Sequence, residues 1–148
     1  GGLSLPEVAI RGRPGWSAGA AGYRDALARR AELPTPLVLY FRTDWCAYCR
    51  RLDEDYLADP RVAEWLAHTL RVEVNPESGP EELELARRFG VRGYPSLFVV
   101  PPNSQGAVRV HPFVRGRAWP PSRFATALEE AAGAASAVPA PQPPGEAP

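Results

Sequence analysis

Short apolar segments separated by polar stretches repeat along the middle of the chain. The run Leu37–Arg42 (LVLYFR) follows two prolines and is apolar up to its last residue, which is typical of a strand buried on both faces. Residues 70–74 alternate between apolar and polar side chains, as a strand does. Residues 97–100 and 107–114 predict two further strands joined by a turn. The pattern therefore predicts four strands.

Helix signals lie between these strands. Ser17 is a capping residue type and predicts a helix that ends at about Ala31. Asp59 followed by proline predicts a helix start, and Gly90 predicts a helix end. The expected helices cover about 17–31, the stretch after Cys49, a short segment from residue 60, residues 80–89 and residues 122–132. Strands that alternate with helices and end in a hairpin predict an α/β fold, with a central mixed β-sheet flanked by helices on both faces.

A length of 148 residues predicts one domain. We expect a flexible segment over residues 1–16, the folded domain over 17–133 and a disordered Ala/Pro-rich tail over 134–148. Seventeen basic residues, all arginine, balance seventeen acidic ones, so no net field favours nucleic acid as a partner. No apolar run is long enough to span a bilayer, so we expect no direct membrane insertion of this chain.

Two cysteines, Cys46 and Cys49, lie where the first predicted strand turns into a helix. His68 and His111 are far apart in the sequence, so we assign them no role and predict no metal site. A disulfide that closes four residues stabilises a fold by only about 2 kcal/mol, so redox chemistry is the stronger explanation of the pair. At the first turn of a helix Cys46 is expected to be the nucleophile, and the deeper Cys49 is expected to resolve a mixed disulfide.

The motif Trp45–Cys49 (WCAYC) and the segment Val91–Ser96 (VRGYPS) together resemble the thioredoxin superfamily, over about residues 17–132. With Leu57–Val62 (LADPRV), the chain is similar to periplasmic thioredoxin-like domains such as the C-terminal domain of the bacterial membrane thiol:disulfide interchange reductase. The resemblance implies a thioredoxin fold in which Pro95 follows a cis bond and lies against the disulfide. It also implies that the backbone of Tyr94 pairs with an extended substrate strand.

Other residues are expected to support this site. Trp45 is interpreted as a wall beside the first cysteine, with core packing as the alternative, and Tyr48 lies between the two cysteines. Thioredoxin has a buried Asp six residues before its first cysteine, and Tyr40 stands at that position here. Asp53 and Glu73 are the candidate proton acceptors in its place, since a buried carboxylate suits proton exchange. Both acids are equally well explained as solvated surface residues.

The resemblance implies a thiol-disulfide oxidoreductase that reduces protein disulfides and needs no cofactor beyond its redox-active disulfide. Ala47 and Tyr48 offer no cation to the thiolate, so we expect a potential in the reducing half of the range from about −120 to −270 mV. The expected partners are a protein disulfide substrate and a separate thiol electron donor. We expect a monomer in the periplasm or another extracytoplasmic compartment, with the cytoplasm as the alternative. A disulfide isomerase or oxidant and a non-catalytic module that binds a protein or Cu(I) stay open as rivals.

Overall fold

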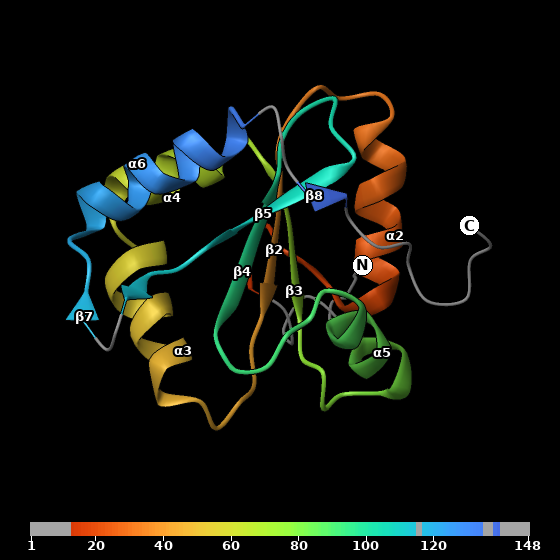
Figure 1. The fold of residues 1–148 in the computed structure, drawn as a ribbon, viewed down its shortest axis with the longest axis horizontal. Coiled ribbons are helices and arrows are strands. Elements are labelled where there is room, and N and C mark those ends of the chain that lie inside the picture. The colour runs from red at the N-terminus through yellow and green to blue at the C-terminus, as the bar shows by residue number, and fades with distance from the viewer. Residues whose placement is uncertain (1–12, 115–116, 135–137, 140–148) are drawn as a thin grey trace, which may run out of the picture.

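A computed structural model describes residues 13–114, 117–134 and 138–139 of the chain (Figure 1). Its centre is one six-stranded sheet with the strand order β1-β3-β2-β4-β5-β8. These strands are β1 (Ser17–Ala18), β2 (Leu37–Phe41), β3 (Leu70–Val74), β4 (Ser96–Val100), β5 (Gly106–Val110) and β8 (Val138–Pro139), and a separate hairpin joins β6 (Phe113–Val114) to β7 (Arg117–Ala118). The helices are α2 (Gly19–Arg30), α3 (Ala47–Arg51), the π-helix η1 (Leu52–Leu57), α4 (Pro60–Leu66), α5 (Pro80–Arg88) and α6 (Pro121–Ala132).

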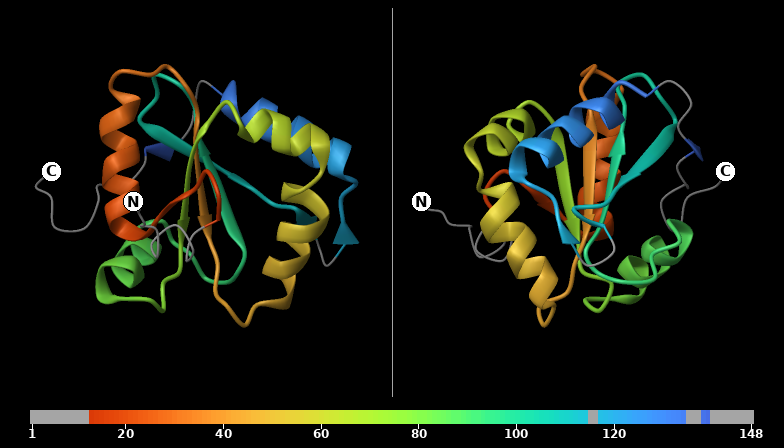
Figure 2. Two further views of the ribbon diagram at one scale, coloured as in Figure 1. Left: turned by 180° about the vertical axis from the view of Figure 1, so that it is seen from behind. Right: turned by 60° about the vertical axis from the view of Figure 1, so that its left-hand side comes forward.

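Helices cover both faces of the sheet. In both views of Figure 2, α2 and α5 lie on one face, and α3, α4 and α6 lie on the other. The central strand β2 is buried throughout and alternates between these two layers. Val38 and Tyr40 pack in the core beneath α4 and α6, while Leu37, Leu39 and Phe41 pack in the core beneath α2 and α5. The predicted mixed sheet with helices on both faces is therefore confirmed.

The neighbours of β2 run in opposite directions. Strand β3 pairs with it in parallel, and β4 pairs with it antiparallel, with Phe41 opposite Ser96. The last residue of β2 therefore lies beside the first residue of β4. The loop that follows β2 and the loop that precedes β4 meet at the same edge of the sheet, although about 50 residues separate them in the sequence.

Two predicted elements differ from the structure. Ser17 does not cap a helix, because it pairs in β1 with Val72, and α2 begins after Ala18 without a side-chain cap. The strand predicted over 107–114 is divided into β5 and β6, with Pro112 between them. Proline has no backbone N–H for a sheet ladder, so the chain leaves the main sheet after Val110.

The contacts of the domain extend beyond its expected boundaries. Trp16 packs against the core, with its ring centroid 6.0 Å from that of Tyr40, and β8 pairs with β5 through Ala107 opposite Val138. Described residues on both sides of the expected domain of residues 17–133 therefore contact it, and the other residues of the two expected terminal segments, 1–12, 135–137 and 140–148, lie outside the described residues. Within the described part of the chain, no helix combines the length and the apolar character needed to cross a membrane.

Candidate active site

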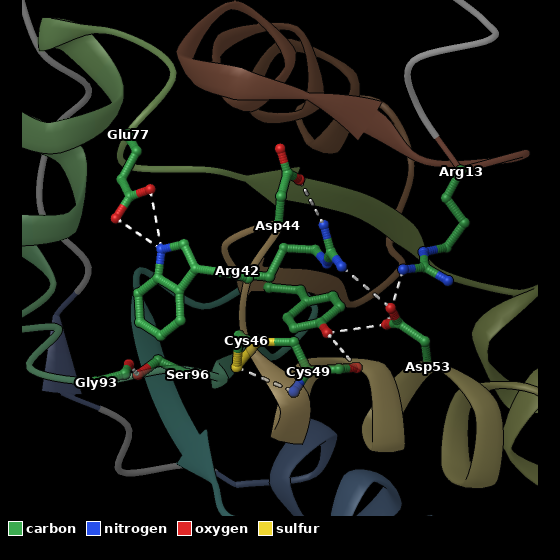
Figure 3. The surroundings of a disulfide bond; sticks show 11 residues. Arg13, Arg42, Asp44, Cys46, Cys49, Asp53, Glu77, Gly93 and Ser96 are labelled. Carbon is green, nitrogen blue, oxygen red and sulfur yellow. Dashed lines mark hydrogen bonds and ion pairs between the residues drawn. A yellow bond between two sulfur atoms is a disulfide. The ribbon is translucent and has the colours of Figure 1, made fainter.

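The cysteine pair lies at the edge of the sheet where β2 ends. Cys46 is the N-cap residue of α3, and its Sγ accepts the backbone N–H of Cys49 at 3.0 Å. The two cysteines form a disulfide, with Cα atoms 5.2 Å apart (Figure 3). Because α3 continues directly into η1, an uninterrupted helical segment directs the positive end of its dipole toward the sulfur of Cys46.

The two sulfur-bearing residues differ in exposure. Cys46 is 5% exposed, whereas Cys49 is fully buried one turn deeper. A reactant that approaches from solvent therefore meets Cys46 first, and Cys49 reacts from inside the protein. This arrangement has the geometry that the sequence predicted for a nucleophile and a resolving thiol; the roles themselves stay predictions.

A second segment lies at the same edge of the sheet. The Tyr94–Pro95 peptide bond is cis and directly precedes β4. The ring of Tyr94 lies edge-to-face against Trp45, with centroids 6.0 Å apart. The structure therefore brings the residue before the first cysteine next to the residue before the cis proline.

A cavity of about 310 Å³ connects the two segments. Tyr48, Tyr94 and Pro95 form part of its lining, so the structure brings three of the expected support residues together. The remaining wall comes from the chain after β5 and consists of His111, Pro112 and Phe113. These last residues were not predicted to belong to the site, because their position depends on the break after β5 that places them beside α3.

The wall of this cavity is aromatic and carries little charge. The ring of Phe113 packs against Tyr48, with centroids 5.2 Å apart, and the guanidinium of Arg51 lies over both rings. Burial and, to a smaller extent, the nearby Arg109 lower the pKa of His111 below 6.5. The imidazole of His111 is therefore neutral at pH 7, and the cavity suits an uncharged side chain of a bound peptide.

A third loop holds Trp45 in place. The indole of Trp45 is 64% exposed, and its N–H donates to both carboxylate oxygens of Glu77, at 3.1 and 3.0 Å (Figure 3). Glu77 follows β3, and its own backbone N–H donates to Oδ1 of Asn75 at 2.9 Å. Trp45 is thus exposed and not packed in the core, and its role as a wall beside Cys46 stays a prediction. The Asn-Pro sequence before Glu77 predicts a turn. Nothing near Glu77 in the sequence predicts its contact with the distant indole of Trp45.

Tyr40 occupies the position where thioredoxin has a buried Asp. Its side chain is fully buried, and its hydroxyl donates to Oδ1 of Asp53 at 2.9 Å and lies 3.2 Å from the carbonyl oxygen of Cys49. Burial and the neighbouring carboxylate raise the pKa of Tyr40. The phenol therefore keeps its proton at neutral pH, and its oxygen links the backbone carbonyl of Cys49 to Asp53.

The two candidate proton acceptors belong to one cluster of ion pairs. Asp53 contacts the guanidinium groups of Arg13 at 2.8 Å and Arg42 at 3.3 Å, and Arg13 also contacts Glu73 at 3.3 Å. The carboxylates are only 17% and 15% exposed, so neither acid is a solvated surface residue. Asp53 joins the hydrogen bonds that lead to Cys49, whereas Glu73 is one ion pair further away. Within the described residues, no group of three or more His, Cys, Asp or Glu residues is placed to hold a metal ion.

Comparisons with known proteins agree with this geometry. Residues 23–132 match the family model of a thioredoxin-like domain. The chain is 30% identical over 117 residues to the thiol:disulfide interchange protein DsbD of Ralstonia nicotianae, covering 78% of this chain and 18% of that protein. It is 33% identical over 78 residues to the protein disulfide-isomerase of Gallus gallus, covering 53% of this chain and 14% of that protein. The chain therefore spans less than a fifth of the length of either relative.

Solved structures of thioredoxin-like proteins also resemble this chain. A thioredoxin from Thermus thermophilus matches with a TM-score of 0.58 at 28% identity, over 78% of this chain and 86% of that chain. The oxidised C-terminal domain of DsbD from Neisseria meningitidis matches with a TM-score of 0.60, over 78% of this chain and 98% of that chain. At 23% identity this second likeness shows the fold alone. The resemblance expected from the two motifs is confirmed.

The contact between Trp45 and Glu77 predicts a measurable protection of the indole N–H. In Glu77→Ala, hydrogen exchange of the Trp45 indole should be about five times faster, as loss of a hydrogen bond of about 1 kcal/mol implies. Glu77→Gln keeps one acceptor oxygen and should give an intermediate rate. The exchange is followed by ¹H–¹⁵N NMR, with the resonance assigned by its absence in Trp45→Phe. Equal exchange in all three proteins that retain Trp45 would show that the carboxylate does not hold the indole.

Proposed function

Because the chain belongs to the thioredoxin-like family, we propose that it is a thiol-disulfide oxidoreductase that reduces protein disulfides through its Cys46-Ala47-Tyr48-Cys49 site. One observation carries this proposal. A disulfide links the N-cap residue of a helix to a buried cysteine one turn away, at the sheet edge that also carries the cis Tyr94–Pro95 bond. A disulfide that closes so short a loop adds little stability. Stability alone therefore does not explain why this disulfide lies at a helix N-terminus and at the sheet edge that carries the cis proline.

The reaction begins from the reduced dithiol. The thiolate of Cys46 attacks one sulfur of a substrate disulfide, forms a mixed disulfide, and releases the other substrate sulfur, which takes up a proton. Cys49 then loses its proton and attacks the sulfur of Cys46, which frees the second substrate thiol. Two electrons pass from the dithiol to the substrate, and the Cys46–Cys49 disulfide forms. The N–H of Cys49 and the helix dipole stabilise the thiolate of Cys46 during the first step.

Asp53 is the better of the two candidate acceptors for the proton of Cys49. The hydroxyl of Tyr40 lies between this carboxylate and the backbone of Cys49 and holds the carboxylate below the helix turn. Glu73 remains the second candidate, because Arg13 joins it to the same cluster.

The partners of the proposed reaction follow from its chemistry. The aromatic cavity beside Pro95 supports a protein substrate whose chain extends past the disulfide. The oxidised site must be reduced again, which requires a separate thiol protein as electron donor. Because no cofactor takes part in thiol-disulfide exchange, we propose none. We propose that the protein acts as a monomer in the periplasm or another extracytoplasmic compartment, as the family resemblance implies.

The cysteine roles are tested by insulin reduction with dithiothreitol as the electron donor. The wild-type protein should accelerate the reaction, and Cys46→Ser should reduce the rate to the dithiothreitol background. Cys49→Ser should accumulate a mixed disulfide between Cys46 and the insulin chain, visible on a non-reducing gel and by mass spectrometry. Circular dichroism of both variants serves as the folding control. A wild-type rate equal to the background would contradict the proposal.

The direction of electron flow depends on the reduction potential. No cation lies between the cysteines, and Arg51 is directed at the rings of Tyr48 and Phe113, so we expect a potential below about −195 mV in glutathione buffers. Tyr48→His adds a cation beside the thiolate and should raise the potential by about 30 mV or more. A wild-type value above about −180 mV would favour the isomerase or oxidant instead.

A further inference from the structure

A buried hydroxyl closes the turn that carries the cis proline. Ser96, the first residue of β4, is 1% exposed, and its Oγ donates to the carbonyl oxygen of Gly93 at 2.7 Å (Figure 3). This hydrogen bond encloses Tyr94 and Pro95. Ser96 also lies opposite Phe41 in the pairing of β4 with β2. Ser96 therefore joins the turn, through its hydroxyl, to the central strands of the sheet.

An arginine from the next strand holds the same hydroxyl. Nη2 of Arg109 donates to Oγ of Ser96 at 2.7 Å. Arg109 lies opposite Phe98 in the β4–β5 register, and its guanidinium carbon is 5.4 Å from the centroid of that ring. The hydroxyl of Ser96 therefore donates one hydrogen bond and accepts another, and the ring of Phe98 restricts the direction from which the arginine approaches.

We propose that Ser96 and Arg109 are positioning residues for substrate binding, which rests on the oxidoreductase function proposed above. They hold the Gly93–Ser96 turn so that the backbone of Tyr94 is presented to an extended substrate strand beside Cys46. Their contacts given above are to the turn, to the sheet and to each other, and Arg109 also lies near His111 in the cavity wall. Their removal therefore weakens the binding of a protein disulfide and leaves the reactivity of Cys46 toward a small disulfide unchanged. A role in fold stability alone would not separate these two substrates.

Matched substitutions separate the hydroxyl from the shape of the side chain. Ser96→Thr and Ser96→Val introduce side chains of nearly the same volume, both β-branched and suited to a strand, and only threonine keeps the hydroxyl. Arg109→Ala removes the second hydrogen bond at an exposed position. This variant keeps the experiment decisive if valine at the buried position 96 prevents folding.

The experiment measures steady-state reduction of insulin and the second-order rate constant with 5,5′-dithiobis(2-nitrobenzoate) for the wild type and the three variants, with Tm recorded for each. Arg109→Ala should raise KM for insulin about fivefold, as the loss of one hydrogen bond implies. Ser96→Val loses both hydrogen bonds of the hydroxyl and should raise KM at least as much. Ser96→Thr should stay within about twofold of the wild type, because its hydroxyl is kept. The small disulfide should react within about twofold of the wild-type rate in all folded variants.

Several results would overturn the positioning role. Equal losses with insulin and the small disulfide would show a general effect on the site or on stability. An unchanged KM in Arg109→Ala would remove the arginine from the assignment, and equal losses in the threonine and valine variants would remove the hydroxyl. A wild-type protein that reacts with the small disulfide but does not reduce insulin would instead refute the proposed function, and the positioning role would fail with it.

Discussion

The pairing of β2 with β4 is the constraint on which the site depends. It is antiparallel and sets Phe41 opposite Ser96, so the end of one buried strand lies beside the start of another. The chain that leaves β2 enters a helix through Cys46, and the chain that enters β4 passes through the cis bond before Pro95. The sulfur at a helix N-terminus and the turn beside it are therefore brought together by backbone hydrogen bonds in the core.

The polar groups around this edge divide into two systems. Beneath the helix, Tyr40 connects the backbone of Cys49 to Asp53, and Arg13 and Arg42 balance the charge of that carboxylate. On the solvent side, hydrogen bonds from distant loops hold the residues that surround the disulfide, as Glu77 does for Trp45. In the proposed function, the first system takes up the proton of Cys49, and the second shapes the surface that a substrate meets.

Local and periodic features of this fold were predictable from the sequence, and contacts between distant residues were not. The apolar run of β2, the Asp59-Pro60 helix start and the cysteine spacing all express preferences over a few residues, and the structure contains each feature. Ser17 was misassigned because sheet pairing outweighed its capping preference, and the strand predicted over residues 107–114 ignored the missing N–H of Pro112. The contact of Glu77 with Trp45 has no sequence signature, since it forms only when separate loops fold to one edge.

Because Cys46 stands at a helix N-terminus, we expect it to be an unusually reactive thiol in the reduced protein. The most direct test is the rate of iodoacetamide alkylation of Cys46 against pH, measured by mass spectrometry on the reduced protein, with Cys49→Ser to isolate the single thiol. The rate should reach half of its plateau at least about one pH unit below 8.5, the pKa of an unperturbed cysteine. A half-maximum at about pH 8.5 or above would contradict it.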